Sequence, residues 1–135
     1  MQVLAHLNWI AVVLGAVLSM LLGFLWYGPL FGRLWLRSIG KKAEELQSSP
    51  WMYVLAFLGA LVSAFVLAML VGAIGVHGWW RGAVLGAAVS VGIGSMAALV
   101  NGLFHRIPGV AWLLFALYQL LLNAIEGAVF AVWRR

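Results

Sequence analysis

Three polar side chains in the last long apolar segment of the chain are the ones that could do chemistry. Gln119, Asn123 and Glu126 are spaced by four and three residues, so they form one stripe along a helix. Lipid penalises such a stripe, and we expect it to face the inside of the bundle, another protomer or water. The carboxyl group of Glu126 is the group in this stripe that could bind a proton or a cation.

A charged side chain near the centre of a membrane costs at least ~2.5–3.5 kcal/mol. Glu126 can avoid this cost by pairing with a cation, by protonation or by access to water. If the segment is 110–133, Glu126 lies about 6–8 Å beyond its midpoint on the C-terminal side. The candidate partners on that side are Arg81, His6 and His77, together with the C-terminal Arg134 and Arg135.

Two interpretations of Glu126 stay open. In the structural one, Glu126 is a packed, paired or protonated residue that joins helices. In the functional one, it marks a path for protons or cations, which Gln119 and Asn123 continue.

The composition places this stripe in a membrane. Of the 135 residues, 66% are hydrophobic and only 8% are charged, whereas about a quarter of the residues in a typical soluble domain are charged. The solvent for most of the chain must therefore be lipid. The length predicts a single membrane domain over residues 1–135, without a separate soluble module.

Four apolar segments predict an all-α integral membrane protein with four transmembrane helices. Each segment has more than 20 residues, which is enough to cross a hydrocarbon core of ~30 Å. All eight tryptophans lie at or near the segment ends, as is typical of aromatic belts at the two interfaces. The predicted spans are about 8–28, 51–73, 79–103 and 110–133.

The segment 30–47, between the first two spans, has a different pattern. Its apolar residues follow helical spacing and its charged residues occupy the opposite face. This pattern predicts an amphipathic helix in the plane of the interface, which Gly40 could break in two. We interpret it as a topological anchor, or as a site for anionic lipid headgroups, near four basic residues: Arg33, Arg37, Lys41 and Lys42.

An even number of spans puts both termini on one side. That side carries three basic residues, and the loops on the other side carry five: Arg33, Arg37, Lys41, Lys42 and Arg106. The excess predicts that the first and third loops are cytoplasmic and that both termini lie outside, in a multi-pass protein of the cell (inner) membrane.

Three of the spans carry small residues at every fourth position, a pattern that lets helix backbones approach closely in lipid. These rows exceed what four short contacts need, so we predict a tightly packed bundle that forms homo-oligomers. The glycines expected at helix contacts are Gly15, Gly23, Gly82, Gly86 and Gly94.

Several classes of function are not supported by the sequence. The chain has no cysteine, and its three histidines lie far apart in the sequence, so we expect no metal site and no cofactor. It offers no recognisable pair of nucleophile and base, so we do not expect an enzyme. The net charge of +5 falls between apolar segments rather than on one solvated face, so we do not expect nucleic-acid binding.

Two stretches, LNWIAVVLGA (7–16) and WYGPLFGRLW (26–35), carry a resemblance that covers nearly the whole chain. The chain resembles the bacterial membrane family called domain of unknown function 1761. This resemblance implies a small four-helix membrane protein and implies no activity. Its most specific part is the block formed by Trp26, Tyr27, Phe31, Gly32 and Trp35.

The chain departs from that family's pattern at three positions. Family members often carry polar residues where this chain has Phe115 and Tyr118, and an apolar residue where it has Glu126. Glu126 therefore cannot be taken over as a family site, and its interpretation rests on this sequence alone.

Three classes of function follow from these patterns. The most concrete prediction is a homo-oligomeric conduit or transporter for protons or hydrophobic cations, centred on Glu126. The alternative is a non-catalytic accessory or structural subunit that packs on a larger membrane complex. An enzyme acting on lipid ranks last.

Overall fold

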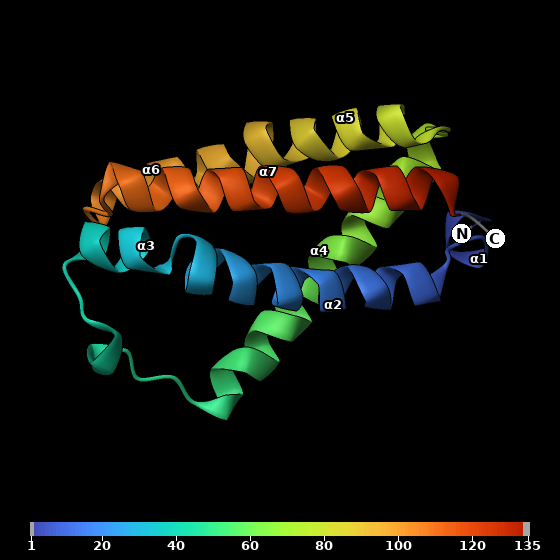
Figure 1. Cartoon of the computed structure of the whole chain (residues 1–135). Helices are drawn as coiled ribbons and strands as arrows, with labels where there is room; N and C mark the ends of the chain where they lie inside the picture. Colours follow the sequence, from blue (N-terminus) through green and yellow to red (C-terminus); the bar gives the residue numbers. More distant parts are fainter. Residues whose placement is uncertain (1, 134–135) are drawn as a thin grey trace.

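A computed structural model describes residues 2–133 of the chain, and this part is built from helices without a strand. Figure 1 shows the helices packed as an elongated bundle. The helices are α1 (Gln2–Ala5), α2 (Trp9–Leu25), α3 (Gly32–Ile39), α4 (Pro50–Ile74), α5 (Trp79–Val89), α6 (Met96–Phe104) and α7 (Gly109–Val132), joined in part by π-helical turns at Trp26–Leu30 and Ser90–Ser95 and a 3₁₀ turn at Ala43–Glu45.

Four helical segments are long and apolar enough to cross a membrane. They differ from the predicted spans by two residues at most, at the end of the first span (30 against 28). The predicted all-α class with four such helices is confirmed, and these helices indicate a multi-pass membrane protein. The segments are Trp9–Leu30, Pro50–Ile74, Trp79–Phe104 and Gly109–Val132.

Proline and glycine set several of the helix ends. Pro50 is the first residue of α4, where its missing N–H costs no hydrogen bond. Gly75 ends the same helix with a φ of 71°, and Gly40 ends α3 with a φ of 68°. Both angles lie in the left-handed region that favours glycine, so these two residues cap their helices and stop them.

The segment 30–47 forms α3 and the short 3₁₀ turn, with the break at Gly40. Figure 1 shows α3 continuing beyond α2 in roughly the same direction, and α3 also contacts α7. Its amphipathic pattern is therefore part of a helix that caps one end of the bundle. Its position in the plane of the interface stays a prediction.

The closest helix pair in the bundle is α5 with α7. A Cβ atom added to Gly82 would collide with the carbonyl oxygen of Gly127, and one added to Gly86 would collide with that of Asn123. Only glycine at these two positions lets the backbones come this close.

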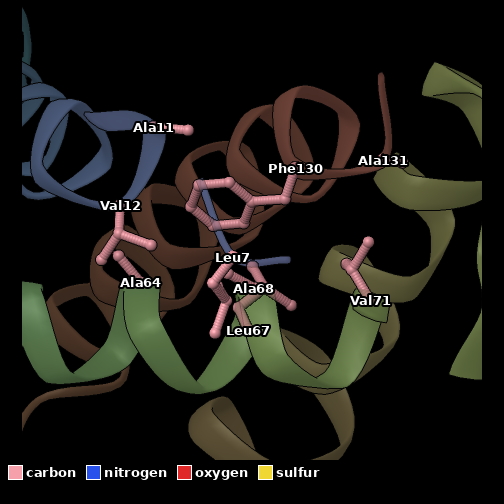
Figure 2. Packing of buried hydrophobic residues seen from close by; sticks show 9 residues of the cluster. All are labelled: Leu7, Ala11, Val12, Ala64, Leu67, Ala68, Val71, Phe130 and Ala131. Carbon is pink, nitrogen blue, oxygen red and sulfur yellow. The ribbon is translucent and has the colours of Figure 1, made fainter. Parts of the chain in front are cut away.

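The buried apolar core lies at the end of the bundle where the chain begins and ends. Figure 2 shows the ring of Phe130 pointing from α7 toward side chains of α2 and α4. At the same end, Asn8 caps α2 through the N–H of Ala11 and donates a hydrogen bond to the carbonyl oxygen of Trp133. The core residues are Leu7, Ala11, Val12, Ala64, Leu67, Ala68, Val71, Phe130 and Ala131.

The opposite end of the bundle is open because α4 crosses it obliquely. Figure 1 shows the second half of α4 packed among the other helices and its first half diverging from them. Nearly all residues of 50–59 are exposed, whereas Ala64, Leu67 and Ala68 are buried. We call the two ends the closed half, which holds the termini, and the open half, which holds the first and third loops.

Candidate functional site

A cavity of about 1200 Å³ fills the space between the diverging half of α4 and the other helices. Residues from all four spans line it. Its mouth lies beside the first and third loops, at Gln47, Ser48 and Arg106. Along α7 its wall extends from Pro108 to Glu126, roughly 27 Å at 1.5 Å per residue. The cavity therefore reaches from the end of the open half to the border of the closed half.

Glu126 forms the deep end of this cavity and is only 2% exposed. Small residues on the facing helices leave room for its carboxyl group. A Cβ atom added to Gly15 of α2 would lie 3.0 Å from Oε1 of Glu126 and 3.3 Å from the Cβ atom of Ala64 in α4. A larger residue at position 15 would push the carboxyl group out of this place.

The carboxyl group of Glu126 makes no hydrogen bond and no ion pair within residues 2–133. The suggested partners Arg81, His6 and His77 are all exposed, and the structure does not bring them to Glu126. The other suggested partners, Arg134 and Arg135, lie outside the described residues. Within the described residues, the buried carboxyl group of Glu126 therefore faces a cavity and has no basic partner.

The three residues of the predicted polar stripe do not all lie in the same environment. Gln119 lines the cavity together with Glu126. Asn123 does not line it, and the backbone of this residue lies against Gly86 at the contact of α7 with α5. The structure therefore brings two of the three side chains to one wall and places the third beside the closest helix pair.

Aromatic side chains form much of the cavity wall. Their rings contact one another across helices: the centroids of Phe24 and Tyr53 are 5.9 Å apart, and those of Tyr27 and Tyr118 are 5.8 Å apart. The face of an aromatic ring is negative and attracts cations. The seven aromatic residues on the wall are Phe24, Tyr27, Trp35, Tyr53, Trp112, Phe115 and Tyr118.

Tyr118 also ties α7 to α2 halfway along the cavity. Its hydroxyl group donates a hydrogen bond to the carbonyl oxygen of Ser19 (2.8 Å) and lies 3.0 Å from the Ser19 hydroxyl. The sequence does not indicate that these two residues form a pair in the site. The sequence feature that could have indicated this pair is Ser19, which belongs to the row of small residues in the first span.

The corner between α2 and α3 is built from the block of residues that carries the family resemblance. Trp26 is buried, and its indole N–H donates to the carbonyl oxygen of Leu114 (3.0 Å). Its ring lies 4.5 Å from that of Phe31, and Tyr27 and Trp35 meet edge to face at 5.3 Å. Trp26 is thus an exception to the expected aromatic belts, because it holds helices together inside the protein.

The predicted packing glycines differ in what they contact. Gly15, Gly82 and Gly86 lie against other helices, and a Cβ atom on Gly23 would lie 3.6 Å from the Tyr118 hydroxyl. Gly94 has open space around it within the described residues. A contact of Gly94 with a second protomer stays a prediction.

A second, smaller cavity of about 330 Å³ lies in the closed half, lined by His6, Asn8 and Trp133 among others. Phe130 also lines it and lies one turn of α7 beyond Glu126. The Cζ atom of Phe130 is 3.2 Å from a Cβ atom added to Gly15. Gly15, Ala64 and Phe130 are thus neighbours between Glu126 and the second cavity, and we call these three residues the separating layer.

Within residues 2–133, no three histidine, aspartate or glutamate side chains gather into a group that could hold a metal ion. The chain has no cysteine. The chemistry available in the large cavity is that of one carboxyl group, the amide of Gln119, and aromatic and hydroxyl groups.

Four apolar helices around a cavity that ends at a buried carboxyl group define a small polytopic membrane protein. The chain belongs to the family described as "Protein of unknown function (DUF1761)", which matches residues 10–131. The resemblance seen in the sequence is thereby confirmed. No curated protein and no solved structure matches the chain. The family description names no activity, so a functional argument must rest on the site.

Proposed function

We propose that this protein is a small membrane transporter or conduit for protons or hydrophobic cations, with Glu126 as its ionisable centre. One observation carries the proposal. Glu126 is the single acidic residue within the four spans, since the other two acids are Glu44 and Glu45. It is buried at the end of a cavity and has no hydrogen-bonding or ionic partner within the described residues.

The burial of Glu126 makes its charge costly. An ionised carboxylate without a partner costs several kcal/mol in a low-dielectric interior. Since no described basic residue pairs with it, the Glu126 carboxyl group can avoid this cost by holding a proton, by binding a cation or by meeting water in the cavity. The cavity gives a proton or a cation a path to the carboxyl group, and Gln119 offers a polar group on the same wall.

The second cavity supports transport rather than binding alone. It approaches the separating layer from the closed half, while the large cavity approaches it from the open half. A small displacement of α4 relative to α7 at Ala64 and Phe130 would change which cavity reaches Glu126. Such an exchange of access is what a carrier needs to release its load on the other side.

Flux measurements on proteoliposomes test this proposal. One set carries an imposed pH gradient and a second carries a gradient of ethidium, an aromatic cation. We expect the wild type to dissipate at least one gradient and Glu126→Gln to dissipate neither. Glu45→Gln is the matched control, because it removes an exposed carboxylate outside the spans, and it should behave as the wild type. Wild-type vesicles as tight as protein-free ones would refute the proposal.

The alternative is a non-catalytic accessory subunit of a larger membrane complex. The observation that favours it is the exposed first half of α4, which a partner helix could cover. This role needs no buried carboxyl group, so complex formation would survive Glu126→Gln. It would fail in Gly86→Leu, which disrupts the bundle itself. The predicted homo-oligomer is tested by native mass spectrometry from mild detergent, where a monomer alone would count against it.

A further inference from the structure

We infer that the large cavity binds an organic cation with an aromatic body, which enters sideways from the lipid beside α4 and is held there by the charge of Glu126. This inference rests on the proposed function and narrows it to one class of substrate. It is argued from the groups around the carboxyl group, from the aromatic wall and from the charge at the mouth.

The surroundings of Glu126 do not suit a metal cation. Hard cations such as Ca²⁺ and Mg²⁺ take six or more oxygen ligands. Here the carboxyl group faces Gly15 and Ala64, and Leu122 lines the cavity one turn before it. An organic cation needs no such oxygen cage, because its charge is weakly hydrated and one carboxylate can balance it.

The rest of the cavity suits a ligand with rings. Aromatic side chains line it from three of the four spans: Tyr27 from the π-helical turn after α2, Tyr53 from α4, and Tyr118 and Phe115 from α7. A flat or multi-ring body can stack against these rings while its charge lies on the side of Glu126. The volume of about 1200 Å³ exceeds the 300–1000 Å³ typical of small-molecule sites, so a ligand of several rings has room.

The weak contact between α4 and α6 gives a second route into the cavity, from the side. Ala56 and Gly59 on α4 line the cavity and are also exposed. The facing wall is formed by Ala98 and Asn101 of α6, and α4 has little contact with α6. In a membrane this side opening faces lipid, which a hydrophobic cation enters readily.

Charge at the mouth favours this side route. Arg106 lines the mouth of the cavity, and Arg33 and Arg37 are exposed on α3 in the same half. Lys41 and Lys42 on the first loop are offset by the exposed Glu44 and Glu45. The arginine charges repel a cation that approaches from water through the loops. They have a much weaker effect on one that enters beside Ala56 and Gly59, deeper in the span.

Binding of tetraphenylphosphonium to the purified protein in mild detergent tests the inference. Equilibrium dialysis should show saturable binding that weakens at least about tenfold in Glu126→Gln and is retained in Glu45→Gln. Tetraphenylborate has the same shape and the opposite charge, so it should not bind saturably. Equal binding of both ions, or unchanged binding in Glu126→Gln, would overturn the inference.

A second pair of variants tests the place of binding without changing any charge. A Cβ atom on Gly59 would have no heavy atom within 4 Å, so Gly59→Phe can put a ring into the opening without displacing the backbone. It should weaken tetraphenylphosphonium binding at least about fivefold, which is about 1 kcal/mol. Val62→Phe is the matched control, because Val62 lies on the same helix, is 62% exposed and does not line the cavity. Equal binding by both variants would contradict the assigned site.

A third measurement tests whether a second copy of the chain fills the opening instead. The protein has no native cysteine, so Ala56→Cys introduces a single thiol on the cavity wall. Tetraphenylphosphonium should slow its reaction with a maleimide. If mild oxidation instead links the protomers quantitatively through this cysteine, a second copy occupies the opening and the inference fails.

Failure of the inference and failure of the proposed function give different results. If tetraphenylphosphonium does not bind while proton flux still requires Glu126, the inferred class of substrate is wrong and the proposed transport of protons is supported. If tetraphenylphosphonium binds as expected while the vesicles hold both gradients, the inferred binding site is supported and the proposed transport function is wrong.

Discussion

The closed and open halves of this bundle both contain glycines, but these glycines have different surroundings. In the closed half, Gly82 and Gly86 bring α5 and α7 into backbone contact. In the open half, Gly59 and Gly94 have open space around them. Small residues permit close approach but do not enforce it. The difference teaches that a row of small residues does not by itself say where two helices meet.

Glu126 lies at the border between the two halves. Gly15 and Ala64 give it room on the closed side, and the aromatic wall begins on the open side. A carboxyl group in the closed half would be buried by packing, and one in the open half would meet solvent or lipid. At the border it is buried and still reachable through the cavity, which is the arrangement that transport requires.

The largest effect on stability is expected from a substitution that separates α5 from α7 in the closed half. Leucine at position 86 would collide with the backbone of Asn123, so Gly86→Leu should destabilise the protein by more than about 4 kcal/mol or prevent folding. Thermal unfolding in detergent, followed by circular dichroism, measures this effect. Gly59→Leu changes the same residue type in open space and should unfold close to the wild type. Similar unfolding of the two variants would remove the distinction between the halves.

A smaller effect is expected from thinning the separating layer. Phe130 is 5% exposed, and Phe130→Ala should cost about 3–5 kcal/mol of stability. It should also let protons leak between the two cavities. Discharge of a pH gradient in proteoliposomes measures the leak. Val132→Ala is the control, because Val132 is 60% exposed and should leave the leak unchanged. Vesicles with Phe130→Ala as tight as those with Val132→Ala would show that Phe130 does not separate the cavities.

Loss of the hydrogen bonds between Ser19 of α2 and Tyr118 of α7 should lower the free energy of unfolding modestly. Tyr118→Phe removes the hydrogen bonds to Ser19, and interhelical hydrogen bonds in membranes contribute about 0.6–2 kcal/mol. Chemical denaturation in mixed micelles measures the change in unfolding free energy. Tyr53→Phe is the control, since the Tyr53 hydroxyl makes no hydrogen bond within the described residues. An equal change in both variants would indicate that the Tyr118 hydroxyl does not join the helices.

The smallest effect is expected at the surface of the open half. Arg37 is exposed on α3, and a basic residue near an anionic membrane surface contributes about 1 kcal/mol. Arg37→Gln should therefore reduce the thermal stabilisation that added phosphatidylglycerol gives, without changing stability in neutral lipid. An identical lipid effect in wild type and variant would exclude Arg37 from headgroup binding.

The four long helices could be predicted because their apolar runs match the membrane thickness and because Pro50 and Gly75 mark ends. The penalty for a charge in lipid likewise predicts that Glu126 avoids lipid, and it is buried. The cavity could not be predicted. It depends on the oblique path of α4, and the regular spacing of small residues along α4 does not show which of them, such as Ala56 or Ala64, will touch another helix.

Two residues show where helical spacing reaches its limit. Asn123 shares a helical stripe with Gln119 and Glu126, yet only the latter two line the cavity. Trp26 resembles the other tryptophans at span ends, yet it is buried, and the carbonyl oxygen of Leu114 accepts its N–H. In both cases the neighbouring helix decides the surroundings, and no pattern within one helix contains that information.

The most direct test of the account is whether water reaches the wall of the large cavity from the side of the first and third loops. In a chain without native cysteines, Gln119→Cys places a thiol on the cavity wall, and Leu121→Cys places one on an exposed face of α7 that does not line the cavity. We predict that a membrane-impermeant maleimide labels Gln119→Cys from the side of the first and third loops and not from the side of the termini, while Leu121→Cys stays unlabelled. If Gln119→Cys is as inert as Leu121→Cys from both sides, the cavity does not connect Glu126 to water and the account is wrong.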